Sequence, residues 1–556
     1  MKWQILNEIT NFKVDDILKA LLENRGLKAK KEIEEFLNPI DPKDFTAKEL
    51  GIKANEVKKA LLRVNRAIEK NESIIVYGDY DADGICATAI LWETLYRLTK
   101  NVLPYIPERV TEGYGLNKEA ILKLKTQDPN LKLIITVDHG IVAKEKIAYA
   151  KELGIDVIVC DHHQLGKENP ICEAIIHTDK ICAAAIAWFM ARELINGQGL
   201  TTDYLDLVAI ATISDLEPLL GVNRSFAKYG LQSLNKTKRC GLLAIMEEAG
   251  ITPGQIGTFE VSYIIAPRLN AMGRMEHALE SLRLICTSKN TQAKELAAKL
   301  GATNRERQAL TAETAVHAKD LLRQEMVNNK LPKLIFLYHE IYQEGVIGLV
   351  AGKLAEEFGR PAIVVSRGEI HSKASARSIN GFNIIEAIRA SSDLLIDAGG
   401  HPMAAGFTVE TAKIELLKQK LLETAEKELS EEALQKTLKI DLELPLEAIS
   451  RKLWDELEKL APFGLGNPEP VFKARAIVKD FRIVGNDGKH LKLTLSPFPL
   501  ANSRLPIVYS AIAFNQGYLE EKLRVGDEIE FAYSLSLNSW NGDQKLELKI
   551  KDIKKL

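Results

Sequence analysis

The chain has few cysteines, and none of them forms a Cys-x-x-Cys pair. The six lie far apart in 556 residues, at positions 86, 160, 172, 182, 240 and 286. This scatter argues against a structural zinc site and favours a reducing compartment. The first residues also lack the apolar core and cleavage site of a signal peptide, so we expect a cytoplasmic protein.

Long apolar runs and a strong net charge are also missing. The longest uncharged apolar stretch near a predicted helix, ICAAAIAWFMA, lies between Lys180 and Arg192 and is too short to span a bilayer. The formal net charge of -2 creates no overall basic field, so a nucleic-acid-binding surface would have to be local. A composition of 46% hydrophobic and 27% charged residues is that of a globular protein, and the length suggests three or four domains.

Apolar strands alternate with amphipathic helices after a mainly helical N-terminal region of about 70 residues. Four apolar segments predict strands: SIIVYGD, NVLPYIP, LKLIITVD and IDVIVCD. The sequences between them predict helices, among them residues 117–126, for which Asn117 is a suitable N-cap. Buried strands separated by helices are typical of a parallel sheet that is covered on both faces.

The second half of the chain has further parts. A long charged stretch over residues 291–326 predicts a helix between domains, and a second α/β unit begins at KLIFLYHE (333–340). After about residue 438 the sequence becomes β-rich. Two segments, residues 481–496 and 538–553, contain runs of alternating apolar and polar residues. Asn-Asp-Gly in the first and Asn-Gly in the second separate these runs, which predicts two hairpins. A small antiparallel barrel of the OB type fits this pattern.

Acidic and imidazole side chains follow three of the predicted parallel strands. VYGDYDADG (76–84), IITVDHG and IVCDHH contribute Asp79, Asp81, Asp83, Asp138, Asp161, His162 and His163. The carboxyl ends of parallel strands share one edge of a sheet, where ligands bind, so these side chains should converge. Asp215, in the apolar segment LVAIATISDLEPL, is a further contribution. Oxygen-rich ligands with one or two imidazoles suit Mn²⁺ or Mg²⁺, and we expect a pair of such ions.

Two other interpretations of the aspartates fit less well. D-x-D-x-D-G opens an EF-hand loop, but the twelfth position from Asp79 is Ile90, where calcium binding needs a glutamate. The EF-hand also requires a helix before the loop, and here a β-rich run precedes it. Any single aspartate could be a solvated cap or turn residue. That interpretation does not account for the full set at several strand ends.

These motifs resemble the DHH phosphoesterase superfamily and, within it, the RecJ exonuclease family. GDYDADG, VDHG, DHH (161–163) and ISDLEPLLGVNR match the first four family motifs. PRLNAMGR (267–274), GGHPMAAG (399–406) and LAPFGLGNPEPVF (460–472) resemble later RecJ segments, the second being the signature of the accessory DHHA1 domain. The N-terminal ENRGLKAKKEIEEFLNP is similar to the RecJ leader, so the resemblance covers nearly the whole chain.

The resemblance implies an α/β architecture with a β-barrel at its end. A parallel-sheet DHH domain is joined by a long helix to a smaller α/β DHHA1 domain, and a C-terminal OB-like barrel follows. The expected boundaries are an N-terminal helical leader at 1–70, the DHH catalytic domain at 71–285, the linking helix at 286–330, the DHHA1 substrate-binding domain at 331–430 and the OB-like nucleic-acid-binding domain at 431–556.

A two-metal site also follows from the resemblance. Asp81 and Asp138 would hold one ion. The second ion would be bound by Asp138, Asp83, His162 and Asp215, so that Asp138 bridges the two. A bridging carboxylate suits two ions about 3.5–4 Å apart, which together can activate a water and polarise a phosphoryl group.

Further residues lie beside the expected ligands. By resemblance Asp79 and His163 would serve catalysis, and His163 would reach the scissile phosphate or orient its neighbours. Asp161 would accept a hydrogen bond from an imidazole and fix its tautomer. His139 stands where RecJ proteins commonly have Asn. It either contacts metal or phosphate, or is a partly exposed bystander.

Arginine side chains suit phosphodiester binding because their planar fork matches phosphate oxygens. The expected set is Arg109, Arg268, Asn270, Arg274, Ser375, Arg377 and His401. The residues between 268 and 274 share one short predicted loop, and by resemblance those of the DHHA1 domain face the metal site across a cleft. For any single arginine, a surface ion pair is the alternative.

The resemblance implies a two-metal-dependent exonuclease that hydrolyses single-stranded DNA from the 5′ end to 5′-mononucleotides, in DNA repair and recombination. Two alternatives stay open. One is a DHH phosphodiesterase for short oligonucleotides or cyclic dinucleotides, which the long chain and OB-like tail disfavour. The other is an inactive RecJ-like replication scaffold, which would be expected to have lost metal ligands. A single-strand binding protein and a helicase are further partners that the sequence does not specify.

Overall fold

The computed structural model describes residues 1–556 except 110, 197–202, 327–329, 486–487, 499–507 and 541–542. The chain divides into two compact units. The central unit comprises Phe45–Glu217 and Tyr229–Lys436, and the terminal unit comprises Met1–Asp44, Pro218–Lys228 and Thr437–Leu556. In the part of the chain that is described, no helix combines the length and apolar character needed to cross a membrane.

The first half of the central unit is built on a five-stranded parallel sheet. Its strands are β2 (Ser73–Tyr77), β3 (Val102–Tyr105), β4 (Leu131–Val137), β5 (Asp156–Asp161) and β6 (Ala174–His177). They lie in the order β3-β2-β4-β5-β6, and all neighbours are parallel. The predicted parallel sheet is confirmed, with β6 as an additional strand. Strand β3, which follows β2 in the sequence, pairs with one edge of β2, and the next strand, β4, pairs with the other edge. A topological switch point therefore lies between β2 and β4.

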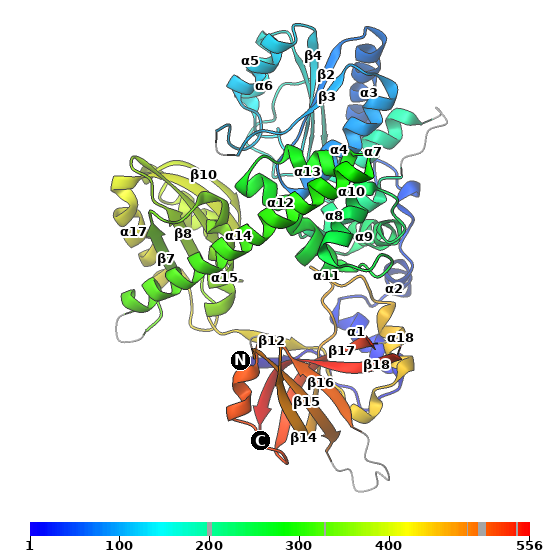
Figure 1. Cartoon of the computed structure of the whole chain (residues 1–556), viewed down its shortest axis with the longest axis vertical. Helices are drawn as coiled ribbons and strands as arrows, with labels where there is room; N and C mark the ends of the chain where they lie inside the picture. The colour runs from blue at the N-terminus through cyan, green and yellow to red at the C-terminus, as the bar shows by residue number, and fades with distance from the viewer. Residues whose placement is uncertain (110, 197–202, 327–329, 486–487, 499–507, 541–542) are drawn as a thin grey trace. The chain divides into compact units, whose positions relative to one another are not determined.

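Helices cover both faces of this sheet (Figure 1). They are α3 (Ala54–Glu69), α4 (Ala82–Leu98), α5 (Lys118–Gln127), α6 (Lys144–Glu152) and α7 (Ala183–Ile195), while α8 (Leu205–Ser214) packs on α4 and α7. Ile121 of α5 and Ile147 of α6 join the sheet residues Ile134 and Val157 in one core. Helix α4 packs against α7 and α8 on the other side, and its first turns are buried. The apolar strands are therefore buried on both faces, as a parallel sheet requires.

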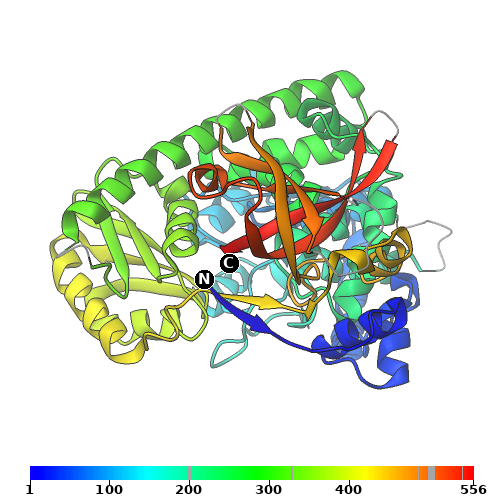
Figure 2. The same ribbon diagram turned by 90° about the horizontal axis from the view of Figure 1, so that it is seen from below.

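A run of helices leads to the second sheet. Its members are α9 (Gly221–Leu234), α10 (Cys240–Ala249), α11 (Thr258–Glu260), the π-helical segment η2 (Val261–Ile265), α12 (Ala266–Met275), α13 (Leu279–Cys286) and α14 (Asn290–Glu325). Helix α14 packs against α10 and α12 near its start and against α15 (Glu344–Phe358) near its end. Figures 1 and 2 both show it extending between the two α/β parts of the central unit, as predicted for a linking helix.

The second sheet is mixed. Its strands β7 (Ile335–His339), β8 (Ala362–Ser366), β9 (His371–Arg377), β10 (Leu395–His401) and β11 (Ala404–Glu410) have the order β10-β11-β9-β8-β7. Strands β7 and β8 pair in parallel, and the other neighbouring strands of this sheet pair antiparallel. One face packs on α14 and α15, for example through Leu322 and Leu354. The other packs on α16 (Ile384–Arg389) and α17 (Ile414–Glu428).

The terminal unit contains the predicted barrel. Its strands are β13 (Leu442–Glu443), β14 (Phe472–Val484), β15 (His490–Pro497), β16 (Tyr509–Ala513), β17 (Glu528–Trp540) and β18 (Asp543–Lys555). They run in the order β13-β14-β15-β16-β18-β17, and pairing of β14 with β17 closes the sheet. Both predicted hairpins, β14–β15 and β17–β18, are antiparallel pairs. The turn residues 486–487 and 541–542 lie outside the described residues.

The N-terminal region is not entirely helical. Strand β1 (Lys2–Ile5) pairs in parallel with β12 (Thr437–Ile440), and Trp3 Nε1 donates to Asp552 Oδ2 at 2.8 Å. Helices α1 (Val14–Asn24), α2 (Lys30–Leu37) and α18 (Arg451–Glu458) complete the unit. Short 3-10 turns of both units lie at Pro42–Asp44, Ser392–Leu394, Thr411–Lys413, Leu446–Ala448 and Gly517–Glu521. The short strand β1 was missed because its partner lies more than 400 residues away.

Candidate metal centre and phosphate-binding pocket

The ends of β2, β4 and β5 bring the predicted acidic and imidazole residues together. Tyr77 lies opposite Thr136, and Val137 lies opposite Cys160, so the three strands end at the same level beside the switch point. Three groups have ligand atoms within 4.8 Å of one another: Asp138, His162 and His163; Asp83, His162 and Asp215; and Asp79, Asp81 and Asp138. The groups share Asp138 and His162, which makes them one connected cluster.

The three aspartates between β2 and the first turn of α4 are held in different ways. Asp81 is the N-cap of α4, and its Oδ1 accepts a hydrogen bond from Gly84 N at 3.1 Å. The two oxygens of buried Asp83 accept from the backbone N–H groups of Ala183 and Ala184, at 2.8 and 2.7 Å. Asp79 packs so closely on Gly84 that a Cβ at this glycine would lie 2.6 Å from the Asp79 Cβ. The tight turn therefore needs glycine at position 84.

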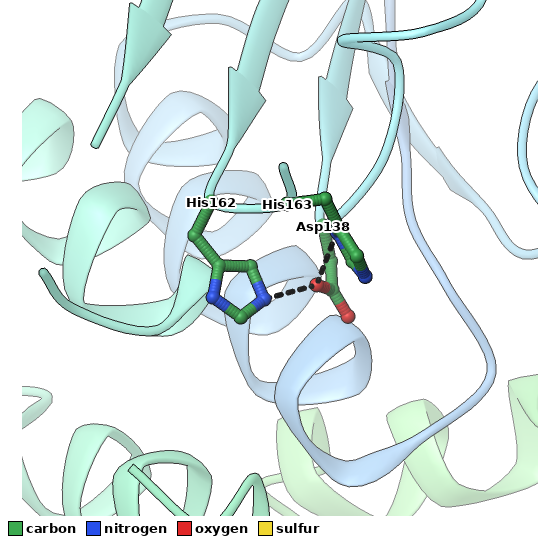
Figure 3. Close-up of side chains that lie close together, drawn as sticks. All are labelled: Asp138, His162 and His163. Carbon is green, nitrogen blue, oxygen red and sulfur yellow. Dashed lines mark ion pairs between the residues drawn. The ribbon is translucent and has the colours of Figure 1, made fainter. Parts of the chain in front are cut away.

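Asp138 and His162 form the closest contact of the cluster. Asp138 follows β4 with φ of 68°, an uncommon conformation for a non-glycine residue that is often found at functional sites. Its Oδ1 lies 3.2 Å from His162 Nε2 and 3.9 Å from His163 Nδ1 (Figure 3). His162 Nε2 is also 3.7 Å from Asp83 Oδ2 and from Asp215 Oδ2. One imidazole nitrogen thus faces three carboxylates.

Asp215 reaches the cluster from a helix. It is the C-cap of α8 and does not stand at the end of a further strand. The helix is apolar on all sides because it is buried, and such a segment cannot be told from a buried strand by periodicity alone. Two residues later, Glu217 Oε1 lies 3.4 Å from Nδ1 of His162. Sequence reasoning did not single out Glu217, which stands within the quoted motif ISDLEPLLGVNR.

Asp161 and Tyr114 position His163. Asp161 Oδ1 accepts from His163 N at 3.1 Å and lies 2.8 Å from His163 Nδ1, while its Oδ2 accepts from Ile141 N. Tyr114 donates to the carbonyl oxygen of Asp138 at 2.9 Å, and its hydroxyl lies 3.3 Å from His163 Nε2. The ring of His401 stacks on that of His163 with centroids 6.1 Å apart. These contacts turn the His163 ring toward the second α/β part of the central unit.

His139 belongs to the core. It is only 2% exposed, and its Nε2 lies 3.0 Å from the carbonyl oxygen of Tyr77. Burial lowers the pKa of His139 to about 4, so the ring is neutral at physiological pH. The alternative of a partly exposed bystander is wrong, because the ring is buried and packs inward against Tyr77, while a contact of His139 with metal or phosphate stays a prediction.

The electrostatics of the cluster match a cation site. Burial and the charges of neighbouring carboxylates raise the pKa of Asp79 and Asp138 well above the usual value. Burial first, and then Asp83, raise the pKa of Asp215 to about 8. Burial opposes a charge on His162, but hydrogen bonds to Asp138 and Glu217 raise its pKa to about 12. These carboxylates therefore need a positive charge among them.

The donor set also suits Mn²⁺ or Mg²⁺. Oxygen atoms predominate, with one or two imidazoles, and this combination favours such cations over softer metals. Asp79 Oδ1 is buried and has no hydrogen-bond partner among the described residues, which leaves its lone pairs available to a ligand. His162 Nε2 faces the carboxylates while its other nitrogen is held by Glu217, as is usual for an imidazole metal ligand.

A polar pocket of about 430 Å³ adjoins the cluster. Its lining includes Asp81, which also belongs to the cluster, and the predicted substrate residues Arg109, Asn270, Arg274, Ser375 and Arg377. Burial, and then the charges of Arg109, Arg307 and Arg377, lower the pKa of Arg274 to about 10. Like charges crowded beside a pocket are relieved by an anion, and arginines bind phosphate oxygens well. The pocket therefore suits a phosphate group.

Position on a helix decides which residues of the PRLNAMGR segment reach this pocket. The segment belongs to helix α12, not to the loop that was predicted. Asn270 and Arg274 are four residues apart and share a face, and the buried Asn270 Oδ1 lacks a hydrogen-bond partner among the described residues. Arg268 is not part of the pocket lining. Its Nε pairs with Glu248 Oε2 at 2.8 Å, so the phosphate contact expected for it is not supported.

Glycines bring the two sides of the pocket together. A Cβ at Gly345 of α15 would lie 2.3 Å from the carbonyl oxygen of Arg274, and one at Gly348 would lie 2.9 Å from Ser375 Oγ. The pocket also contains Tyr80, Tyr114 and Lys373, which were not predicted. Tyr80 stands between the predicted residues Asp79 and Asp81, which was the available signal, whereas Tyr114 has no predicted residue next to it in the sequence. Lys373 precedes Ser375 by two positions on β9 and so shares its face.

The chain matches three protein-family descriptions. Residues 73–212 match the DHH family N-terminal domain, residues 331–431 the DHHA1 domain, and residues 440–552 the RecJ OB domain. The matches cover the parallel sheet, the mixed sheet and the barrel, respectively. They confirm the predicted DHH, DHHA1 and OB-like architecture.

Relatives and solved structures agree with these matches. The chain is 36% identical to the single-stranded-DNA-specific exonuclease RecJ of Bacillus subtilis (strain 168), over 97% of this chain and 68% of that protein. It is also similar to crystal structures of RecJ from Thermus thermophilus with Mn²⁺ (TM-score 0.81, 30% identity) and with Mg²⁺ (TM-score 0.76, 29% identity). These cover 100% of this chain and 80% and 78% of the respective crystal chains. The chain therefore belongs to the RecJ family of the DHH/DHHA1 proteins.

Proposed function

We propose that this chain is an exonuclease that uses Mn²⁺ or Mg²⁺ to hydrolyse single-stranded DNA from its 5′ end to 5′-mononucleotides. The observation that carries the proposal is the position of Asp81, which belongs both to the cation cluster and to the arginine-lined pocket. A phosphate held by the arginines would therefore lie next to the cations. Membership of the RecJ family supplies the expected substrate and the 5′ direction.

Five residues are proposed as the cation ligands. They are Asp81, Asp83, Asp138, His162 and Asp215, and Asp79 lies close enough to contribute a sixth side chain. Divalent cations bound here supply Lewis-acid catalysis for phosphodiester hydrolysis. The shared position of Asp138 between the groups supports its proposed role as the bridge.

The reaction breaks the bond between phosphorus and the 3′-oxygen of the terminal nucleotide. Water adds to the phosphorus of the next nucleotide, the 3′-oxygen leaves with a proton, and the shortened strand keeps a 5′-phosphate. Arg109, Arg274 and Arg377 would bind the phosphate oxygens, and Ser375 would donate from its hydroxyl. These contacts position the strand before the bond breaks.

His163 is proposed to act at the scissile phosphate. Its Nδ1 is held by Asp161, so the ring is oriented with Nε2 toward Tyr114. Burial would raise the pKa of Asp161, but hydrogen bonds from His163 and from two backbone N–H groups lower it. The Asp161 carboxylate is thus charged and keeps the proton on Nδ1 of His163. His401, stacked on this ring, would contact nearby nucleotides.

The barrel is proposed to bind single-stranded DNA, as OB domains do. Phe472 and Tyr533 are buried in the core of the terminal unit, so these two aromatic residues pack the barrel. The family also suggests a role in DNA repair and recombination, with a single-strand binding protein and a helicase as partners. All six cysteines are free, which supports a cytoplasmic location for a DNA-processing enzyme.

One assay tests the proposal directly. The purified chain is incubated with single strands labelled at the 5′ or the 3′ end, with Mn²⁺, Mg²⁺ or EDTA. We expect the 5′ label to appear at once as a mononucleotide, the 3′ label to shorten stepwise, and EDTA to stop both. The D138A variant should be inactive.

Controls separate the alternatives. A duplex of the same sequence should resist hydrolysis, and a dinucleotide should be a poorer substrate than the long strand. Faster hydrolysis of dinucleotides or cyclic dinucleotides than of the long strand would favour a small-substrate phosphodiesterase. Full activity in D138A, or none in the native chain, would contradict the proposal.

A further inference from the structure

A groove of about 620 Å³ lies where the N-terminal segment meets the barrel of the terminal unit. Three large apolar side chains in its lining are only partly covered: Ile5 is 37% exposed, and Phe12 and Phe498 are each 38% exposed. The other apolar residues of the lining are Ile9, Pro445 and Ala474. Single exposed apolar side chains are common on protein surfaces, but several that meet in one groove indicate a binding site.

Both sides of this groove are fixed to the same core. Strand β1 pairs in parallel with β12, and the two are the blue and yellow strands that run side by side in Figure 2. Trp3 donates from Nε1 to Asp552 Oδ2 at 2.8 Å, and Lys554 Nζ lies 4.0 Å from the centre of the Trp3 ring. Ile9 packs against the core of the terminal unit. The groove is therefore formed before a partner binds, which lowers the entropic cost of binding.

The charge of the groove is negative. Three carboxylates line it, those of Glu8, Glu443 and Glu447. Arg475, also in the lining, is paired with Glu530 at 2.9 Å. Lys473 lies between Glu443 and Glu530, at 3.4 and 3.2 Å. In the described part of the chain, the other two carboxylates of the lining have no ion pair.

This combination of shape and charge selects the class of partner. Carboxylates repel the phosphates of a nucleic acid strand, so the groove does not suit DNA. They complement lysine and arginine side chains. In an amphipathic peptide segment, apolar residues three or four positions apart can fill a groove while basic residues between them reach its rim. A volume of about 620 Å³ also lies within the range of about 300–1,000 Å³ that is usual for ligand pockets.

We propose that the groove binds a basic amphipathic segment of a partner protein. Phe12 and Phe498 would be the apolar anchors, because partly covered aromatic side chains contribute much of the free energy of binding at protein interfaces. Glu8 and Glu447 would select a basic segment over an acidic one. The groove shares no residue with the cation cluster or the phosphate pocket, so binding here does not depend on the proposed exonuclease activity.

Peptides selected from a random library test the chemistry of the partner. A phage library of random peptides of about twelve residues is panned on the purified chain, and each recovered peptide is synthesised with a fluorescein label. We expect recovered peptides that are rich in lysine or arginine and carry apolar residues three or four positions apart. Recovery of no such peptide would overturn the proposal.

Fluorescence anisotropy then measures the affinity of these peptides for variants of the groove. The variant carrying both E8K and E447K should bind them at least about 10-fold more weakly, and this difference should shrink at high salt. F12A should also bind them about 10-fold more weakly. E521K and Y518A are the matched controls, because Glu521 and Tyr518 are exposed on the same unit and lie outside the groove lining. Equal affinities of the native chain and the groove variants would overturn the proposal.

Two further measurements distinguish other occupants of the groove. Analytical ultracentrifugation of the chain alone tests a second copy, and we expect no dimer that depends on the groove. A dimer that dissociates in the variant carrying both E8K and E447K would overturn the proposal in favour of self-association. A labelled single strand should bind F12A as tightly as it binds the native chain. If F12A instead loses affinity for the strand and keeps its affinity for the peptides, the groove binds DNA and the proposal is wrong.

Discussion

Glu217 holds the outer nitrogen of His162, on the side of the ring opposite Asp138. Glu217 Oε1 lies 3.4 Å from Nδ1, Asp138 Oδ1 lies 3.2 Å from Nε2, and the side chains of His162 and Glu217 are only 12% and 11% exposed. When a cation takes the place of the Nε2 proton, a proton on Nδ1 shared with Glu217 would leave the Nε2 lone pair for the metal. This arrangement fixes the tautomer that a metal-binding imidazole needs.

Removal of the Glu217 carboxylate should weaken cation binding. We expect E217A to bind Mn²⁺ about 10- to 100-fold more weakly, because the His162 ring loses its orienting partner. E217Q can still accept the hydrogen bond and should recover much of the affinity. Calorimetric titration with Mn²⁺ measures the affinity, and E306A on the exposed side of α14 is the control. Equal affinities of E217A and the native chain would contradict the role.

The tautomer itself can be observed. In protein labelled with ¹⁵N-histidine and bound to Mg²⁺, the His162 signals should show the proton on Nδ1. In E217A, we expect a mixture of tautomers. A ring that keeps its Nδ1 proton in E217A would show that Glu217 does not set the tautomer.

The metal-free protein should lose stability as the pH rises. The folded-state pKa of Asp83 is raised to about 6 and that of Asp215 to about 8, mainly by burial, from an ordinary value of 3.8. A raised carboxyl pKa contributes stability that is complete below the unfolded-state value and is lost as the pH rises through the folded-state value. We therefore expect the Tm with EDTA to fall between pH 5 and pH 8, by on the order of 5 °C. Thermal melts at the two pH values measure it.

Divalent cations should remove this pH dependence. Mg²⁺ at saturating concentration neutralises the repulsion among the carboxylates and binds only the folded state, so the Tm at pH 8 should rise. D215N, which loses one titrating group, should show a weaker pH dependence with EDTA. A Tm with EDTA that increases from pH 5 to pH 8 would be the opposite of this expectation.

The arginines of the pocket should control substrate affinity. We expect R377A to lower kcat/KM for single-stranded DNA about 100-fold, because a half-buried guanidinium that lines the pocket and is proposed to bind the phosphate is lost. The slope of log affinity against log salt concentration should also fall by about 1. R323A is the matched control, since Arg323 is exposed and pairs with Asp320 on the same helix. Equal salt dependence in R377A and the native chain would exclude a phosphate contact.

A buried arginine should stabilise the terminal unit. Arg224 Nε donates to the carbonyl oxygen of Phe36 at 2.6 Å, and its terminal nitrogens donate to those of Leu460 and Ala461 at 2.9 Å. Burial lowers the pKa of Arg224 to about 10, yet the group stays charged at neutral pH. We expect R224M to lower the free energy of unfolding by about 3–5 kcal/mol, because the carbonyl groups lose their donors.

Denaturant unfolding followed by circular dichroism measures this change. R323A serves again as the control and should stay within about 0.5 kcal/mol of the native chain. A loss of less than about 1 kcal/mol in R224M would mean that water replaces the guanidinium at these carbonyl groups.

Much of the site followed from local sequence. Asp79, Asp81 and Asp83 stand directly behind an apolar run, and Asp138 and Asp161 stand behind two others. Apolar runs of this kind form buried parallel strands, and parallel strands place their carboxyl ends at one edge. The convergence of these residues could therefore be predicted without coordinates. The family motifs added the assignment of His162 and Asp215 to one of the two expected ions.

Other features depended on contacts that local sequence does not encode. Arg268 and Arg274 belong to the same motif, but the helix turns one toward Glu248 and the other toward the pocket. His139 follows Asp138 directly and still points into the core. Successive residues of a loop or helix face different directions, so adjacency in sequence does not imply a shared environment.

The sequence alone determined which residue types stand at the ends of which strands, because hydrophobic periodicity and turn residues act over a few positions. It thereby determined the parallel sheet, the barrel and the chemistry of the cluster. Only the tertiary structure decided that Glu217 supports His162, that Tyr114 lies beside His163 and that β1 pairs with β12. These relationships join residues far apart in the chain, and the rotation and packing of whole elements set them.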